Sequence, residues 1–554
     1  MSTAADTRPR AHRVDPPQRG GQQTLAGTGA LIRFILRRDR IKLPAWLLGI
    51  TVMLAYYTAL LPTVYEGDEE MQSLASFMTG PVGALISGPG YGADQLNLER
   101  LIVGVYGIYF LLLAALMNML LVSRHTRVDE QHGRTELLRA TVVGRHAPLT
   151  AVLTVAVAAN ALLALLLTGV MVGNDFDAGQ SLLFGAGVGA AGLLFAGVTA
   201  LTVQITEYSR AATGLAGAVL GVAWVIRAAG DMLAQHGSAL SWFSPLAWVQ
   251  QTRPYVDGRW WPLLLVVGLT AVVTAVAYAL ASRRDVGAGL LAARRGSPSA
   301  AAWLASPLAF AFRLHRASLI GWGIALGLAG LLWGWITEPM IDTYEGMGDD
   351  ILAIFGGDAS NIIDGYLSVM ALVTALLVGV FVILGVQTLR VEETKGRAEP
   401  VLATAISRWS WAGSHLVVLA LGVIGLLLLA GITTGIGAAA SLGDAGYAWE
   451  VTLAHLAHTP AVLLLLGIAA LLFGAVPKAI GAVWAVLGYG MLIGFFGPLM
   501  DPPQWAYDIS PFEHVARAPL DDLTVSPILA LTGVAVVLLA AGLAGFRRRD
   551  LETK

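Results

Sequence analysis

Residues 127–145, RVDEQHGRTELLRATVVGR, are written twice in this chain. The second copy, RVEETKGRAEPVLATAISR at residues 390–408, lies 263 residues later and aligns without a gap. Nine of the 19 aligned positions are identical, and Asp129 is matched by the equally acidic Glu392. Each copy lies between two long apolar runs, so a charged segment occupies the same place in two halves of the chain.

The apolar runs around these segments predict membrane-spanning helices. About 20 apolar residues are needed to cross the hydrocarbon core of a bilayer, and runs of that length recur along the chain. Hydrophobic residues make up 56% of the sequence and charged residues 13%, and the mean hydropathy is +0.68. The runs are continuous, without the alternation of a membrane β-barrel. The predicted fold is therefore an all-α polytopic membrane protein.

Twelve spans are predicted, and the distribution of charge orients them. Most of the Lys and Arg residues fall between spans on one side, which predicts that both termini are cytosolic. The loops predicted outside are acidic, and we interpret Asp349 and Asp350 as solvated loop residues rather than a metal site. The predicted spans are residues 43–63, 101–122, 148–172, 181–203, 212–229, 262–281, 317–337, 366–387, 413–436, 456–476, 480–499 and 525–545.

Further landmarks show that a unit of six helices is repeated. Ser244-Pro245 is matched by Ser510-Pro511, and Arg283-Arg284-Asp285 by Arg548-Arg549-Asp550. Since each half begins and ends inside, the halves are predicted to be parallel repeats with a pathway between them. The predicted organisation is a disordered cytosolic tail (1–23), a first six-helix half with an interfacial, amphipathic elbow helix (24–285), a cytosolic linker (286–301) and a second six-helix half (302–554).

Several kinds of chemistry are excluded by the sequence. The chain contains no cysteine, which excludes disulfides, thiolate metal sites and cysteine nucleophiles. A glycine-rich stretch, residues 88–92, is not followed by the lysine of a phosphate-binding loop. We therefore predict no catalytic residue, no metal site and no cofactor bound by this chain.

Ionisable residues inside the spans are few, and the clearest is Arg227. Asp231 follows four residues later, on the same helical face. One interpretation is an arginine that extends to the outer interface and pairs with Asp231, and the other is a contact in the transport pathway or its gate. Asn118 and Asn160 are expected to be hydrogen-bond partners between helices.

The duplicated segment differs from an ordinary basic loop. The second span of each half can continue as helix to Glu130 or Glu393, after which a glycine permits a sharp turn. If the helix persisted through the glycine, Glu130–Arg134 and Glu393–Arg397 would be i,i+4 pairs. The rule that loops inside are basic requires no Glu-Gly-Arg spacing, so we predict a docking element. Its candidate residues are Asp129, Glu130, Gly133, Arg134, Glu136, Arg145, Glu392, Glu393, Gly396, Arg397, Glu399 and Arg408.

Residues 118–145, together with the EExxGRxExxxA pattern of the second copy, resemble the first cytosolic loop of ABC-2-type transporter permeases. The fused twelve-span form is similar to actinobacterial exporters of polyketide antibiotics, the tetronasin-resistance type. In that family the loop forms a coupling helix that contacts an ATP-binding subunit. The resemblance covers nearly the whole chain, including the elbow and the six-span unit.

This resemblance implies a transport subunit rather than an enzyme. The chain would export hydrophobic drug-like, antibiotic-like or lipid-like compounds across the bacterial cell membrane. ATP and Mg would be bound by a partner, an ABC ATPase homodimer on one permease chain, and no nucleic acid is implied. Two alternatives remain: a proton-coupled secondary multidrug exporter, which needs acidic residues within spans, and a polytopic membrane enzyme acting on lipid-linked substrates.

Overall fold

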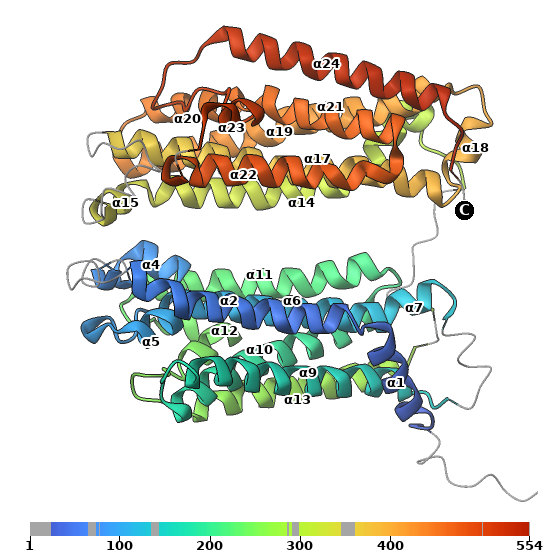
Figure 1. The fold of residues 1–554 in the computed structure, drawn as a ribbon. Helices are drawn as coiled ribbons and strands as arrows, with labels where there is room; N and C mark the ends of the chain where they lie inside the picture. The colour runs from blue at the N-terminus through green and yellow to red at the C-terminus, as the bar shows by residue number, and fades with distance from the viewer. Residues whose placement is uncertain are drawn as a thin grey trace, which may run out of the picture. The chain divides into compact units, whose positions relative to one another are not determined.

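The computed structural model describes residues 24–64, 74–76, 78–134, 143–284, 287–290, 298–344, 361–500 and 502–552. The predicted tail, Glu136 and the Asp349–Asp350 pair lie outside the described residues. The chain divides into two compact units, Met1–Arg295 and Gly296–Lys554. The described residues are helical and contain no strand, and twelve helices are long and apolar enough to cross a membrane (Figure 1). The predicted all-α polytopic fold is confirmed.

The first unit holds six spans and several short elements. The spans are α2 (Lys42–Val64), α6 (Gly107–His125), α9 (Ala147–Val172), α10 (Ala178–Ile205), α11 (Ser209–Leu233) and α13 (Trp261–Ala281). The short elements are α1 (Thr28–Arg38), α4 (Pro81–Ile86), η1 (Ala93–Gln95), α5 (Leu98–Leu101), the single π-helical turn η2 (Ile102–Tyr106), α7 (Arg127–Gln131), η3 (Ser241–Phe243) and α12 (Pro245–Gln250).

The second unit also holds six spans. They are α14 (Pro307–Trp335), α17 (Ile362–Thr394), α19 (Arg408–Leu442), the pair α20 (Gly446–Ala457) and α21 (Thr459–Ala475), α22 (Val483–Met500) and α24 (Val525–Arg548). The short elements are η4 (Ala302–Ala305), α15 (Thr337–Tyr344), α18 (Ala398–Leu402), η6 (Pro477–Ala482) and α23 (Gln504–Ile509).

The elbow helix is confirmed as amphipathic. Leu31 and Ile35 of α1 are buried against the unit, whereas Arg33 and Arg37 on its other faces are exposed. The helix packs on α9 and ends at Asp39. In the second unit the corresponding stretch is one continuous helix, α14, so the two halves begin differently.

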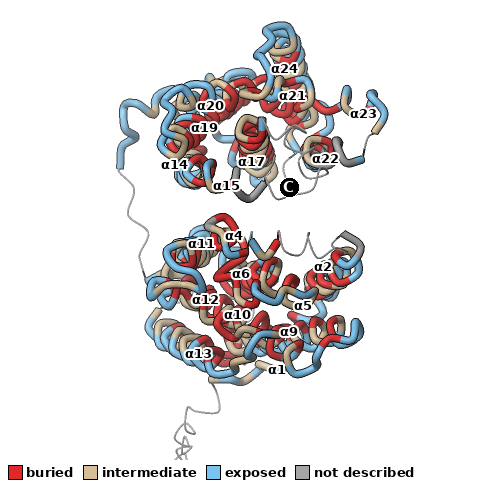
Figure 2. The backbone as a smooth tube through the Cα atoms, turned by 90° about the vertical axis from the view of Figure 1, so that its left-hand side faces the viewer, coloured by how far each residue is buried: buried red, intermediate tan, exposed pale blue. Residues whose placement is uncertain are grey.

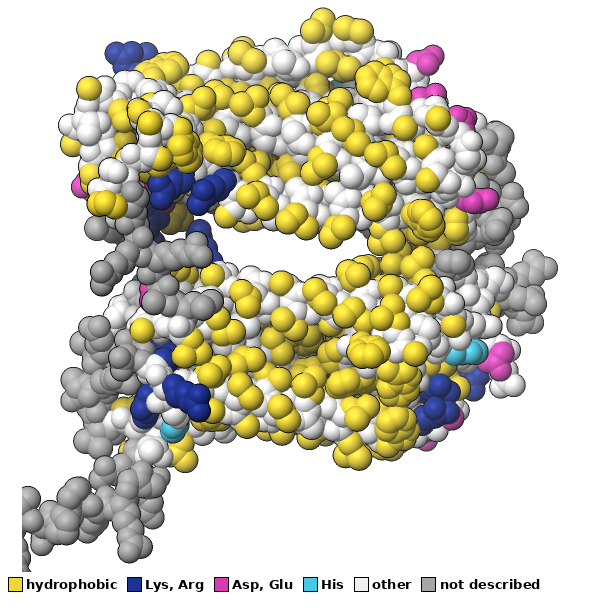
Figure 3. Space-filling view, turned by 180° about the vertical axis from the view of Figure 1, so that it is seen from behind, with side chains coloured by type: hydrophobic (Ala, Val, Ile, Leu, Met, Phe, Trp, Pro, Cys, Tyr) yellow, Lys and Arg dark blue, Asp and Glu magenta, His cyan; other side chains and the backbone are white. Residues whose placement is uncertain are grey.

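The second and fourth spans form the centre of each unit (Figure 2). Glycines allow close approach there: a Cβ on Gly185 of α10 would lie 2.5 Å from the carbonyl oxygen of Ala164 in α9. Asn118 and Asn160 exchange side-chain hydrogen bonds of 2.8 and 3.0 Å between α6 and α9, as predicted. Exposed hydrophobic side chains cover the sides of the helices, and Lys and Arg gather near the helix ends (Figure 3). Such a surface suits contact with lipid tails.

Candidate functional site

Both copies of the duplicated segment end their helix in a left-handed glycine. In the second copy Gly396 (φ 69°) donates to the carbonyl of Glu393 at 2.9 Å, and Arg397 donates to that of Glu392 at 3.0 Å. These two bonds form a Schellman motif, which satisfies carbonyls at the end of a helix. Gly133 (φ 68°) ends α7 in the first copy. The predicted sharp turn is confirmed in both copies, and the short helix expected after it is α18 in the second.

Glu130 and Glu393, the matched glutamates that precede the glycine turns, are held inside the protein. Both carboxylate oxygens of Glu130 accept from Arg284, at 2.6 and 2.9 Å, and Arg127 adds a contact of 2.6 Å. Glu393 is fully buried and is held likewise by Arg549, at 2.5 and 2.8 Å, with Arg390 at 3.5 Å. A two-pronged arginine–carboxylate pair fixes orientation as well as distance. We call each glutamate together with its two arginines a clamp.

Each clamp connects three spans of its own unit. Glu130 and Glu393 lie at the end of the second span, and Arg284 and Arg549 follow the end of the sixth. Arg127 donates at 2.6 Å to the carbonyl of Val203 near the end of α10, and Arg549 donates at 3.3 Å to that of Phe473 in α21. The clamp therefore links the second, fourth and sixth spans at one end of each unit.

The far end of each duplicated segment is also tied to the sixth span. Arg145 donates at 3.1 Å to the carbonyl of Arg284. Its counterpart Arg408 donates at 2.5 Å to the carbonyl of Arg549. In both copies, the two ends of the segment are thus anchored on the residue that follows the sixth span, which is Arg284 in the first unit and Arg549 in the second.

Glu130 does not pair with Arg134, nor Glu393 with Arg397, because the helix does not persist through the glycine. The two glutamates pair with Arg284 and Arg549 instead. Arg134 pairs with Asp129 at 2.9 Å, and Arg397 pairs with Glu392 at 2.9 Å. The bond to Glu392 raises the pKa of Arg397 above its ordinary value.

The outward face of the segment carries a different set of side chains. Arg134 and Arg397 are 48% and 51% exposed, compared with 11% for Glu130 and 0% for Glu393. Exposed polar residues close to the glycine turns also include Gln131, His132, Lys395 and Glu399. The segment thus has a buried side that is fastened to the spans and an exposed side that is free to meet a partner.

Within the first unit, the duplicated segment is joined to the elbow helix. Arg38 of α1 contacts the Asp129 carboxylate at 2.7 Å. The next residue, Asp39, pairs with His125 at 2.6 Å and with Arg124 at 3.0 Å. These contacts add to the clamp of the first unit.

Arg227 and Asp231 lie near the opposite end of the first unit. The Arg227 side chain is fully buried, and it forms the predicted pair with Asp231. It donates at 2.6 Å to the carbonyl of Leu85 and at 3.2 Å to that of Ala84, near the end of α4. Asp231 lies 3.6 Å away and accepts from Ser241 at 2.6 Å. A role in the pathway or gate stays a prediction.

The sequence did not predict the arginine partners of the clamps. Arg284 and Arg549 stand in the repeated Arg-Arg-Asp triplets, far from the glutamates along the chain. A basic residue repeated at the end of the last span, opposite a repeated glutamate, was the available signal. Among the described residues, no group of three or more His, Asp or Glu could hold a metal ion.

Comparison with known proteins assigns the family. The model of the family described as "Multidrug efflux system permease Rv1217c, C-terminal domain" matches residues 30–280 and 304–547. This chain belongs to that family. It is 36% identical over 562 residues to the multidrug efflux system permease protein Rv1217c of Mycobacterium tuberculosis (strain ATCC 25618 / H37Rv), and the match covers the whole of both chains. The chain is therefore a multi-pass permease of the cell membrane.

Proposed function

We propose that this chain is the membrane subunit of an ATP-binding-cassette exporter. It moves hydrophobic drug-like, antibiotic-like or lipid-like compounds out of the cell, driven by a separate ATPase. The name of the relative supports the export of drugs, and the resemblance of residues 118–145 to ABC-2-type permeases supports the ATPase partner. The observation that carries the proposal is the clamp, which is built in the same way in both units.

The clamp makes the duplicated segment a suitable lever. An exposed loop that was only tethered by chain would absorb a push through changes of its own backbone. Here Glu130 and Glu393 are each held by a two-pronged ion pair, with little water to screen it. Displacement of the segment would therefore be transmitted to three spans of a unit together. Two such levers suit two copies of one ATPase subunit.

The burial pattern divides the work within each segment. The clamp glutamates transmit the motion, and the exposed side chains make the docking contact. The docking residues are proposed to be Gln131, His132, Arg134, Lys395, Arg397 and Glu399, which are exposed. Glu130 and Glu393 belong to the transmitting side, because their carboxylates already bind arginines of this chain.

Charge reversal on the exposed face tests this division. The double variant R134E/R397E should fold, since half-exposed ion pairs contribute roughly 0–1 kcal/mol to stability. It should lose copurification with the ATPase and lose drug export from cells. The matched control is R33E/R313E, which reverses two exposed arginines outside both segments. The docking role would be refuted if copurification and export were unchanged both in R134E/R397E and in the triple variant R134E/R397E/K395E.

The stoichiometry gives a separate test. One permease chain should copurify with two ATPase chains, because it already carries two levers. The mass of the purified complex in lipid, measured by native mass spectrometry, decides this. A complex with two permease chains and two ATPases would contradict the proposal.

A proton-coupled exporter is the second candidate, and one observation favours it. His315 and His415 lie within spans of the second unit and are buried, with Nε2 and Nδ1 3.1 Å apart. A buried pair of titratable rings can carry a proton. Export that survives depletion of ATP and stops with an uncoupler would favour this candidate over the ATP-driven one.

A further inference from the structure

A pocket opens at the end of the first unit that is opposite the clamp. Arg100 on its wall and Arg127 of the clamp are separated by a helical stretch of about 40 Å, at 1.5 Å per residue. The cavity itself has a volume of about 50 Å³, and the empty space reaches about 570 Å³ when the open mouth is counted. A ligand larger than a few water molecules would therefore extend into the mouth. Its walls come from residues 89–91, the start of the second span, α10, and α12 with the segment that follows it.

Two irregular pieces of backbone shape this pocket. The π-helical turn η2 places Val103 and Gly104 on its wall, and such turns are frequent at functional sites. The glycine-rich stretch passes close to the opposite wall, with Gly88, Gly90 and Gly92 at φ of 134°, 66° and 78°. A Cβ on Gly92 would lie 2.9 Å from the side chains of both Arg100 and Val256. The glycine-rich stretch, residues 88–92, therefore forms part of the pocket wall.

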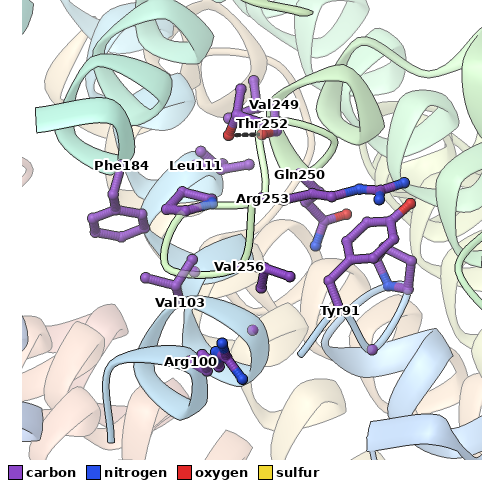
Figure 4. A pocket seen from close by; sticks show the side chains of 15 residues that line it. Tyr91, Arg100, Val103, Leu111, Phe184, Val249, Gln250, Thr252, Arg253 and Val256 are labelled. Carbon is purple, nitrogen blue, oxygen red and sulfur yellow. Dashed lines mark hydrogen bonds between the residues drawn. The ribbon is translucent and has the colours of Figure 1, made fainter. Parts of the chain in front are cut away.

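The pocket has an apolar side and a polar side (Figure 4). Val103, Leu111 and Phe184 lie on one side of the view. Tyr91, Gln250 and Arg253 lie on the other, with the Arg253 guanidinium 3.9 Å from the centre of the Tyr91 ring. The arrangement suits a ligand that is itself apolar at one end and polar at the other.

The pocket lining is positive and has hydrogen-bonding atoms without partners. Among the 15 described residues that line the pocket, Arg100 and Arg253 are the charged ones, and none is acidic. Nε of Arg253 and Oε1 of Gln250 are buried and have no hydrogen-bond partner among the described residues. Asp257 lies 3.6 Å from Arg253 but is not part of the lining. Buried polar atoms without partners are costly, and an anion can accept from Nε of Arg253, although it cannot donate to Oε1 of Gln250, which is itself an acceptor.

Arg100 is fixed in place with donor capacity to spare. Its Nε donates at 2.8 Å to the carbonyl of Tyr255, and one Nη donates at 2.6 Å to that of Gln95. No hydrogen bond to a described residue engages its other Nη. A guanidinium that is already oriented loses little freedom when it binds an anion.

The corresponding pocket of the second unit lacks this charge. It is found beside the matching Ser-Pro landmark, where Val515 stands in the position of Val249. Glu513 and Arg517 both line it, 3.9 Å apart, so acid and base balance each other. The second span there, α17, runs on without a π-helical turn. The positive pocket is therefore a property of the first unit.

We propose that this pocket binds a compact amphipathic anion. Its acidic group, such as a carboxylate, would accept hydrogen bonds from Arg100 and Arg253. Its apolar body would lie against Val103, Leu111 and Phe184. The ligand could be a small organic acid or a fatty acid of the membrane, which share this chemistry. The proposal is independent of ATP-driven export, because binding requires neither nucleotide nor partner.

Binding to the full-length protein in lipid nanodiscs, without nucleotide, tests the proposal. The probes are naphthalene-2-carboxylate, its neutral carboxamide and palmitate. One of the two acids should bind. If the pocket takes small organic acids, naphthalene-2-carboxylate should bind roughly tenfold to a hundredfold tighter than its carboxamide, because hydrogen bonds to a charged group are strong. If palmitate alone binds, the site is one for a membrane fatty acid.

Variants locate the effect in the pocket. R100Q and R253Q should each lower the affinity of the acid at least about tenfold and leave that of the amide unchanged, which also reports that the pocket is intact. The matched control is R259Q, in the same segment but outside the lining. V256W, which fills the pocket from an exposed position, should remove binding altogether. If neither acid binds, or if binding is insensitive to Arg100 and Arg253, the proposal is overturned.

Discussion

The second spans of the two units are alike at one end and different at the other. At one end, Glu130 and Glu393 are held in the same way by arginines that follow the sixth span. At the other end, the first unit has a π-helical turn and a positive pocket, whereas α17 is regular and its pocket holds both an acid and a base. The two units are therefore alike at the end that carries the duplicated segments, and they differ at the end that carries the pockets.

The largest effect is expected from removing a clamp glutamate. E393A leaves Arg549 without its main counter-charge, and E130A does the same to Arg284, which should cost about 3 kcal/mol each. The thermal unfolding temperature of the purified protein, followed by tryptophan fluorescence, measures this. E399A, an exposed substitution in the same segment, is the control and should change stability by about 0.5 kcal/mol or less. A large loss for one glutamate and none for the other would break the likeness of the two clamps.

The turn after each clamp should show a smaller effect of equal size in both copies. Gly133 and Gly396 have room for a side chain, but their left-handed backbone disfavours one. G133A and G396A should therefore each cost about 1 kcal/mol. The matched control is G413A, at a helical glycine of α19 with open space around it, which should be neutral or stabilising. Unequal losses at the two turns would show that the copies differ there.

The elbow contact should separate the two copies. Asp129 accepts from Arg38 as well as Arg134, whereas the hydrogen bonds described for Glu392 come from Arg397. D129N should cost about 1 kcal/mol and E392Q about half of that or less. Hydrogen exchange of the α1 amides should increase in D129N and stay unchanged in E392Q. Equal behaviour of the two variants would contradict the added contact of the first copy.

The smallest effect concerns pH. Burial raises the pKa of the Glu513 carboxyl, which Arg517 offsets only in part, whereas Ala247 stands at this position in the first unit. A raised pKa favours the protonated form in the folded state, so its contribution to stability is present at low pH and is lost as pH rises through the folded-state pKa. The unfolding temperature of the wild type should therefore fall relative to that of E513Q as pH rises from about 4 to 7. A difference independent of pH would contradict this.

The sequence predicted the elements of this protein well. All twelve predicted spans are confirmed as long apolar helices. They could be predicted because the length of an apolar run, which decides whether a helix can cross a bilayer, is given directly by the sequence. The glycine turns were predicted too, since a left-handed residue strongly favours glycine. The sequence failed where the partner of a charge is far along the chain. Glu130 had Arg134 nearby in sequence, but its actual partner, Arg284, is 154 residues away.

The pocket could not be predicted from the sequence, for a similar reason. Arg100 and Arg253 are far apart in the chain, and only the folded first unit brings them to one cavity. The glycine-rich stretch was visible in the sequence, but its pattern indicated only that it is not a phosphate-binding loop. Its positive φ angles become informative once Arg100, Val256 and Gln250 are seen to pack against it.

Site-specific cross-linking tests the central claim, that the two duplicated segments dock the same ATPase. The natural chain contains no cysteine, so H132C and K395C each introduce a single reactive thiol on the exposed faces. After labelling with benzophenone maleimide in native membranes and illumination, mass spectrometry identifies the adduct. Q235C, exposed near the opposite end of the first unit, is the control. The account predicts adducts of both H132C and K395C with one and the same ABC-type ATPase, and none with Q235C. The absence of an ATPase adduct at either segment would contradict it.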